Sequence, residues 1–445
     1  MLFLEKKIIE IFSIFLSLLT FLLISIFPIN YFQYKKILIG YQINFFDSLA
    51  INLILFLNLL LIFSFFSLNL SIIFLFYILI CFFFFCLSFK YYLPFFIKNK
   101  VTFFLFFLIL FFLFVKIAEM SILTWDGAGH WLYKTQNFYQ GNEFKNLVNL
   151  PMNYYPHLGS YVWAFFWKNS FLQLEYFGRF FYIFVFVVSI FSLGQQLNKN
   201  FSTEVKLLIT FVLTALSTNI FLFGGYQEYL IFFIFFVFSR FFFLLQENNK
   251  SFNFIVILIL LTANLVLWVK QEGFFYFIFL NLVFFFHLKS NIYQRFICVI
   301  FSLFFLLFFI FIKIHFFESL RFNENIIHSN LIDNLNFIIF LKKIILIIKY
   351  LLISFIKYPI WVIIIFSSII LFFKYKFFNR FLFLYSFGLL SFLLIFSIYL
   401  QTKLDITVLL PLTLNRLIFP LSGFFIFIII QLLNKIKPKK KYKIF

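Results

Sequence analysis

Long apolar runs fill most of this chain, and they limit it to a membrane-embedded fold. Most of the runs approach the roughly 20 residues that an α-helix needs to cross a bilayer. Backbone polar groups must be satisfied internally in lipid, so we expect these runs to be helices. The mean hydropathy of +1.08 and the 64% hydrophobic content agree. We identify thirteen candidate spans: Ile8–Phe27, Phe46–Phe66, Leu68–Ser88, Val101–Ile122, Tyr176–Leu193, Leu207–Phe223, Tyr229–Leu245, Phe254–Val269, Phe274–Leu288, Phe296–Phe316, Ile360–Phe373, Phe381–Leu400 and Leu417–Leu433.

The composition excludes several other classes. The formal net charge of +21 does not indicate nucleic-acid binding, because the basic residues are spread over short segments between apolar runs, where they set topology. The three cysteines lie within or at the ends of apolar runs and fit neither a disulfide framework nor a zinc site. The 88 phenylalanines suit codon bias at lipid-facing positions and indicate no function.

The predicted fold is an all-α polytopic membrane protein of about thirteen spans, with an external helical loop after the fourth. Tyr161–Trp167 and Phe337–Ile356 suit re-entrant or interfacial helices better than spans. The lysine-rich tail after Asn434 belongs in the cytoplasm, and counting spans backwards places Trp125–Glu175 and Gln401–Asn415 outside. We divide the chain into N-terminal helices (1–100), a membrane core (101–300) with the external loop 124–175, and C-terminal helices (301–445).

Ionisable residues at the ends of the candidate spans gather on the expected outer side. A charge in the middle of a bilayer costs about 3 kcal/mol, so charges at the rim mark candidate sites. Several adjoin Gly127, Gly129 or Gly273, where a helix can end and backbone can approach a ligand. The candidates are Asp126, His130, Lys134, His157, Glu228, Lys270, Glu272, Arg321, Asp405 and Arg416.

Three stretches in this set carry a family resemblance. They are Trp125-Asp126-Gly127 with Trp131, Lys134, Gly141 and Asn153-Tyr154-Tyr155-Pro156-His157-Leu158-Gly159, then Gly225-Tyr226-Gln227-Glu228, and then Trp268-Val269-Lys270-Gln271-Glu272-Gly273. From about Val101 to Leu288 the chain resembles bacterial GT-C glycosyltransferases, which include the protein mannosyltransferases and the aminoarabinose and Rgt-type sugar transferases. It departs from them in having Glu228 where the family usually has Asp, and four expected spans before the loop where many relatives have one.

The resemblance implies inverting transfer of a sugar from a polyprenyl-phosphate donor to a glycan, lipid or protein acceptor. Asp126 would accept the acceptor's proton, and Lys270 and Arg416 would bind the leaving phosphate. His130, Lys134, His157, Glu228 and Glu272 are the other expected substrate-binding residues. No cofactor is certain, and a divalent metal ion held by Asp126 with Glu228 or Glu272 stays open. The expected location is the bacterial inner membrane, with the site facing the periplasm and no nucleic-acid partner.

Simpler roles and other functions compete with this interpretation. Asp126 suits a helix cap, Lys270 with Glu272 an interfacial ion pair, and Arg416 an anchor of the last span. The two histidines suit plain loop residues. An O-antigen ligase or polymerase also acts on lipid-linked sugars, but usually carries its large polar loop late in the chain. A lipid or polysaccharide transporter is expected to show internal repeats and charges near the midplane, and the sequence shows no repeat.

Overall fold

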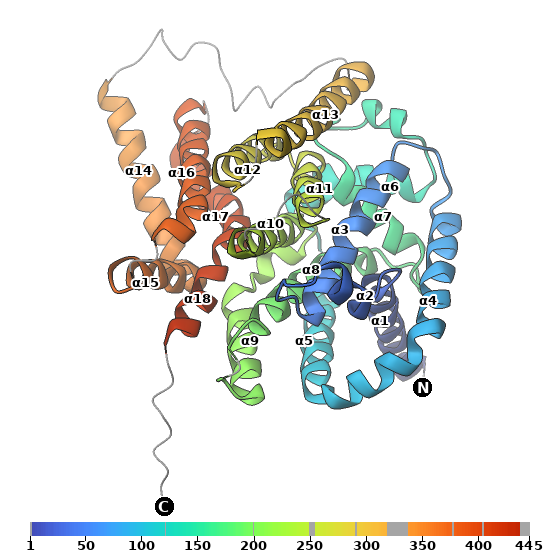
Figure 1. Cartoon of the computed structure of the whole chain (residues 1–445). Coiled ribbons are helices and arrows are strands. Elements are labelled where there is room, and N and C mark those ends of the chain that lie inside the picture. Colours follow the sequence, from blue (N-terminus) through green and yellow to red (C-terminus); the bar gives the residue numbers. More distant parts are fainter. Residues whose placement is uncertain are drawn as a thin grey trace, which may run out of the picture.

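Helices make up this structure, a computed structural model that describes residues 2–120, 122–198, 200–248, 254–289, 292–317, 337–375, 378–402 and 405–436. In chain order they are α1 (Leu2–Ile26), α2 (Tyr31–Ile37), α3 (Phe45–Phe63), α4 (Leu70–Lys98), α5 (Lys100–Glu119), η1 (Gly127–Trp131), α6 (Leu132–Tyr139), η2 (Phe144–Asn149), α7 (Leu158–Lys168), α8 (Tyr176–Gly194), α9 (Thr203–Ser217), η3 (Ile220–Phe223), α10 (Glu228–Asn248), α11 (Phe254–Val269), α12 (Gly273–His287), α13 (Ile292–Phe317), α14 (Phe337–Lys357), α15 (Pro359–Phe373), α16 (Phe378–Gln401), α17 (Ile406–Phe425) and α18 (Phe427–Lys435). In Figure 1, α4 lies at one edge of the molecule and α14 with α15 at the opposite edge.

The protein is an all-α polytopic membrane protein, as the sequence predicts. Among the described residues, nine helices are long and apolar enough to cross a membrane, and one bent pair brings the number to as many as ten. All thirteen expected runs are helical, but α11 and α12 are shorter apolar helices, and α9 has only 15 residues. Phe337–Ile356, expected to be an interfacial helix, forms α14, and together with α15 it is long and apolar enough for a span that is bent by 98°. The Ser319–Asn336 loop with Arg321, and the tail from residue 437, lie outside the described residues.

The last span differs from the expectation in a way that bears on the site. Gln401–Asn415 is expected to be an external loop, yet most of it is the first half of α17. The Asp405 side chain caps this helix by accepting a hydrogen bond from the Thr407 N–H at 2.9 Å. Arg416 therefore lies ten residues, about 15 Å, into the helix rather than at its end. Pro411 and the threonines lowered the apparent helical character of this segment.

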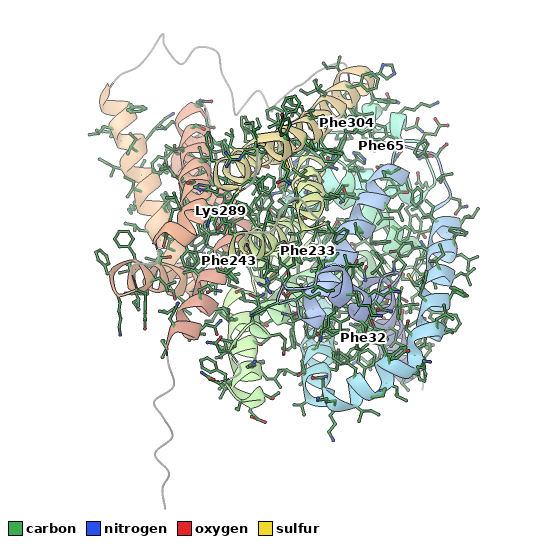
Figure 2. All side chains as sticks on the ribbon, viewed as in Figure 1. Phe32, Phe65, Phe233, Phe243, Lys289 and Phe304 are labelled. Carbon is green, nitrogen blue, oxygen red and sulfur yellow. The ribbon has the colours of Figure 1, made fainter. Side chains whose placement is uncertain are left out.

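Phenylalanines fill the interior as well as the lipid-facing surface. Phe304 on α13 is 61% exposed, whereas Phe233 and Phe243 on α10 are almost wholly buried (Figure 2). The rings of Phe114 and Phe180 stack at 4.1 Å between α5 and α8. Codon bias at lipid-facing positions therefore does not account for all of them, because many of these rings form the packing core.

A buried ion pair joins α3, α8 and α10 far from the candidate site. The Asp47 carboxylate binds the Arg240 guanidinium at 3.0 Å and accepts a hydrogen bond from the Ser192 hydroxyl at 2.5 Å. Arg240 also donates to the Gln42 carbonyl at 2.8 Å. Twelve residues of α10, about 18 Å, separate Arg240 from Glu228, so this pair fastens the other end of the helix bundle.

Asp47→Asn is expected to destabilise the fold by about 3 to 5 kcal/mol, because it leaves the Arg240 charge buried without its partner. Thermal unfolding of the purified protein in detergent measures the loss. The double variant Asp47→Leu with Arg240→Leu should recover part of it, since it removes both charges. A single variant as stable as the native protein would show that the pair does not fasten the bundle.

Candidate functional site

Two loops from distant parts of the chain are joined backbone to backbone at the rim of the site. The Thr124 N–H donates to the Gly224 carbonyl at 2.9 Å, and the Thr124 hydroxyl donates to the same oxygen at 2.7 Å. Gly127 lies so close that an added Cβ would collide with the Gly224 carbonyl. Gly225 has φ +96°, a conformation that favours glycine. The first loop carries Asp126 and the second leads into Glu228, so this junction brings the two carboxylates together.

Arg179, in the first turn of α8, binds the chain at the base of both loops. Its guanidinium binds both Glu175 carboxylate oxygens at 2.8 Å. It also donates to the carbonyls of Phe223 at 2.6 Å and Met120 at 3.3 Å. Burial raises the pKa of Glu175, and the neighbouring Arg179 opposes that rise. One buried arginine thus fixes the chain just before each of the two loops.

Arg179→Met is expected to destabilise the protein by about 3 to 5 kcal/mol, because it leaves Glu175 and two carbonyls without their donor. Amide hydrogen exchange should accelerate over residues 122–127 and 222–228, while the exchange around Asp47 and Arg240 stays slow. Exchange followed by mass spectrometry measures both regions. Equal acceleration in both would mean that Arg179 supports the whole bundle rather than these loops.

Four charged side chains meet where the two loops join. The Arg416 guanidinium binds Asp126 Oδ2 through Nη2 at 2.5 Å and Glu228 Oε1 through Nε at 3.0 Å. The Lys270 ammonium donates to the same Glu228 oxygen at 2.7 Å. Asp126 follows α5, Glu228 begins α10, Lys270 follows α11 and Arg416 lies within α17, four segments that the fold brings to one place. We call these four residues the charged cluster.

The charged cluster borders a cavity of about 310 Å³. Burial is deepest at Glu228, which is fully buried, and the Arg416 side chain is 13% exposed. The Arg416 guanidinium also lies 4.0 Å from the centre of the Tyr226 ring, a cation–π contact that fixes its plane. The lining residues are Trp125, Asp126, His130, Trp131, Met152, Tyr155, Lys270, Glu272, Ile398, Tyr399, Thr402, Leu409, Thr413, Arg416 and Leu417.

His130 lies beside Asp126 in the cavity wall. Its Nε2 is 3.9 Å from Asp126 Oδ1, and its ring stacks against Tyr155 at 5.6 Å. Burial lowers the pKa of His130, and the Asp126 charge opposes that shift. A lowered pKa favours the neutral imidazole at pH 7, so His130 contributes ring contacts and one hydrogen-bond donor rather than a charge.

Lys134 and His157 lie outside the cavity, behind its wall. The Lys134 ammonium is fully buried and donates to the Tyr155 carbonyl at 2.5 Å. His157 Nε2 contacts the Ser64 hydroxyl at 2.7 Å. Burial, with a smaller contribution from the Lys313 charge, lowers the pKa of both groups well below their usual values. These two candidates support the Tyr154–His157 segment in this structure and do not face the cavity.

Glu272 faces the cavity without joining the charged cluster. The expected interfacial ion pair between Lys270 and Glu272 does not form, because Lys270 pairs with Glu228. Among the described residues, no group of three His, Cys, Asp or Glu side chains comes together as a metal site.

Sequence reasoning missed several residues that build the site. Arg179 and Glu175 stand at the start of an apolar run, and an arginine inside a span is itself a signal for a site. Tyr226 lies in one of the resembling stretches, but its contact with Arg416 depends on how α10 and α17 pack. Tyr399, Thr402 and Thr413 had no local signal, because hydroxyl groups are common in membrane helices.

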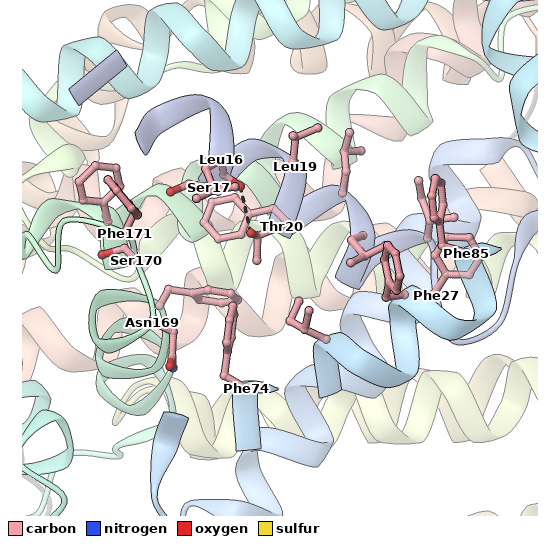
Figure 3. Close-up of a pocket in the computed structure, with 18 of the residues that line it drawn as sticks. Leu16, Ser17, Leu19, Thr20, Phe27, Phe74, Phe85, Asn169, Ser170 and Phe171 are labelled. Carbon is pink, nitrogen blue, oxygen red and sulfur yellow. Dashed lines mark hydrogen bonds between the residues drawn. The ribbon is translucent and has the colours of Figure 1, made fainter. Parts of the chain in front are cut away.

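A second cavity, of about 780 Å³, lies between α1, α4, α5 and the segment after α7 (Figure 3). Its walls are almost entirely aliphatic and aromatic, with Phe27, Phe74 and Phe85 among them. Its hydroxyl groups are satisfied within the chain, as Thr20 shows by donating to the Leu16 carbonyl at 2.9 Å. This cavity offers no group for chemistry, so we place the candidate site at the charged cluster.

Comparison with protein-family models, with curated proteins and with solved structures finds no match to this chain.

Proposed function

We propose that the protein is an integral membrane glycosyltransferase of the GT-C type, which moves a sugar from a polyprenyl-phosphate donor to an acceptor on the non-cytoplasmic face. The observation that carries the proposal is the charged cluster: a carboxylate for proton transfer lies within 2.5 Å of a guanidinium, beside a cavity, in a membrane protein. Three of the four residues come from the stretches that resemble the family.

The resemblance implies an inverting displacement, and the residues of the charged cluster can be assigned to its steps. The acceptor hydroxyl oxygen attacks C1 of the sugar, the bond between C1 and the phosphate oxygen breaks, and its electron pair leaves with the polyprenyl phosphate. Asp126 takes the hydroxyl proton on Oδ1, since Oδ2 is bound to Arg416. The attack and the departure occur on opposite sides of C1, so the sugar inverts its configuration.

Arg416 and Lys270 are placed to stabilise the departing phosphate. Arg416 uses Nε and Nη2 within the charged cluster, and its Nη1 has no hydrogen bond to any described residue. A guanidinium held in this way is preorganised for a charge that develops during the reaction. Glu228 keeps both cations in place, because its Oε1 binds each of them.

Cells with and without the gene test this proposal. Their surface glycans, compared by mass spectrometry, should differ by the mass of one sugar residue, with the matching polyprenyl-phosphate sugar accumulating in the cells that lack the protein. Identical glycans and unchanged lipid-linked sugars would contradict it.

A transporter of lipid-linked sugars is the second candidate, and one observation favours it. Arg416 lies well inside a membrane-length helix, where transporters often place charges. Such a protein would move its substrate across the bilayer and leave every glycosidic bond intact.

A further inference from the structure

One carboxylate at the cavity is not used by the charged cluster. Glu272 lies at the turn between α11 and α12, two residues after Lys270. Its side chain makes no capping hydrogen bond to α12, and its Oε2 is buried with no hydrogen-bond partner among the described residues. A buried carboxylate oxygen without a donor is costly, and Glu228 Oε2 in the charged cluster shares that state. Glu272 differs from Glu228 in that Lys270 and Arg416 pair with Glu228 and not with Glu272.

The turn that carries Glu272 is tightly held. The Gly273 N–H donates to the Lys270 carbonyl at 3.0 Å, and an added Cβ at Gly273 would collide with the Val266 carbonyl. The Tyr276 N–H donates to the Glu272 carbonyl at 3.1 Å as α12 begins. Glu272 therefore keeps a fixed position relative to Lys270 and the cavity.

The charges around the cavity do not balance. Arg416 and Lys270 supply two positive charges, and Asp126 and Glu228 take both of them. Glu272 is the third carboxylate, and burial of His130 favours its neutral form. The unmatched carboxylate attracts hydroxyl or ammonium donors and repels a ligand carboxylate.

Hydroxyl groups line the same cavity. Tyr399 on α16 and Thr413 on α17 are joined at 2.7 Å through their oxygens, and Thr402 lines the cavity beside them. Arg416 Nη1, which the carboxylates of the charged cluster do not bind, provides a donor for a phosphate, while Glu272 and these hydroxyl groups provide acceptors for a polyhydroxyl group. Both kinds of partner occur in one lipid-phosphate sugar.

We infer that Glu272 binds a hydroxyl or ammonium group of the sugar, so that the protein selects neutral or amino sugars over uronic acids. The inference rests on the proposed function and adds the class of sugar to it. Glu272 acts on binding, whereas Asp126 acts on the reaction.

Binding of three synthetic donors to the purified protein in lipid nanodiscs tests the inference. The donors are farnesyl phosphates that carry glucose, glucosamine or glucuronic acid. The native protein should bind the first two roughly 10- to 100-fold more tightly than the third, as expected for a charge-assisted hydrogen bond. Glu272→Gln should bring the three affinities to within a few-fold of one another. Glu143→Gln, which changes a glutamate paired with Lys145 away from the cavity, should keep the native preference.

The preference among the donors decides between the two partner groups. Tighter binding of glucosamine than of glucose assigns an ammonium group, and equal binding assigns hydroxyl groups. A native protein without preference, or a Glu272→Gln variant that keeps the full preference, would overturn the inference. Glu272→Asp serves if the glutamine variant does not fold, since its shorter side chain should also weaken binding of glucose and glucosamine. Binding is measured without turnover, so this experiment can fail while the proposed function still holds. Failure of the proposed function would show separately, as unchanged transfer by an Asp126 variant.

Discussion

Replacing Asp126 with asparagine is expected to reduce sugar transfer by about 100- to 10,000-fold while the protein still inserts and folds. Asparagine has nearly the same shape and its carbonyl oxygen can still accept a hydrogen bond from Arg416, but it cannot take the proton of the acceptor hydroxyl. Transfer of a radiolabelled sugar in isolated membranes measures the change, and thermal unfolding in detergent checks the fold.

Asp405→Asn is the matched control for this variant. Asp405 is an exposed cap of α17, and asparagine caps helices as well as aspartate does, so transfer should stay at the native rate. If Asp126→Asn transfers sugar as fast as Asp405→Asn does, Asp126 is a structural residue and the proposed chemistry is wrong.

Arg416→Met is expected to remove transfer and to destabilise the fold by about 3 to 5 kcal/mol. The guanidinium joins Asp126 to Glu228 and lies on the Tyr226 ring, so its loss leaves two carboxylates close together without their shared cation. The departing phosphate also loses its best-placed donor. Transfer in membranes and unfolding in detergent measure the two effects.

Arg416→Lys separates charge from geometry. Lysine restores a positive charge but cannot bind both carboxylates with a planar fork, so stability should return in part and transfer should stay low. Arg295→Met serves as the control, because Arg295 donates to the Leu288 carbonyl and pairs with neither carboxylate of the cluster. Native transfer by Arg416→Met would remove this residue from the mechanism.

Hydropathy alone predicted the fold class and the position of most of the long apolar helices. The expected runs Phe254–Val269 and Phe274–Leu288 match α11 and α12 almost residue for residue, but both helices are shorter than the roughly 20 residues that a span needs, so counting each run as a span gave too many. Hydropathy also placed the start of the last span too late, because Pro411 and the threonines of α17 resemble a loop.

The candidate site shows the same division. Four residues of the cluster could each be selected from the sequence as ionisable residues near expected helix ends: Asp126, Glu228, Lys270 and Arg416. The contacts among them could not be predicted, because they join positions that lie far apart in the sequence. Lys134 and His157 had the same local signal and lie behind the cavity wall, because α6 and α7 present them to the interior. Residue type and spacing identify candidates, and only the packing of distant helices decides which of them share a cavity.

Transfer by the purified protein in liposomes distinguishes a glycosyltransferase from a transporter. The liposomes contain a polyprenyl-phosphate sugar labelled in the sugar, with the extracted cell-envelope glycan supplied as acceptor. The label is expected to move to the acceptor while an equal amount of polyprenyl phosphate appears. Label that crosses the bilayer still attached to its lipid, with no new glycosidic bond formed, would contradict the proposed function and favour a transporter.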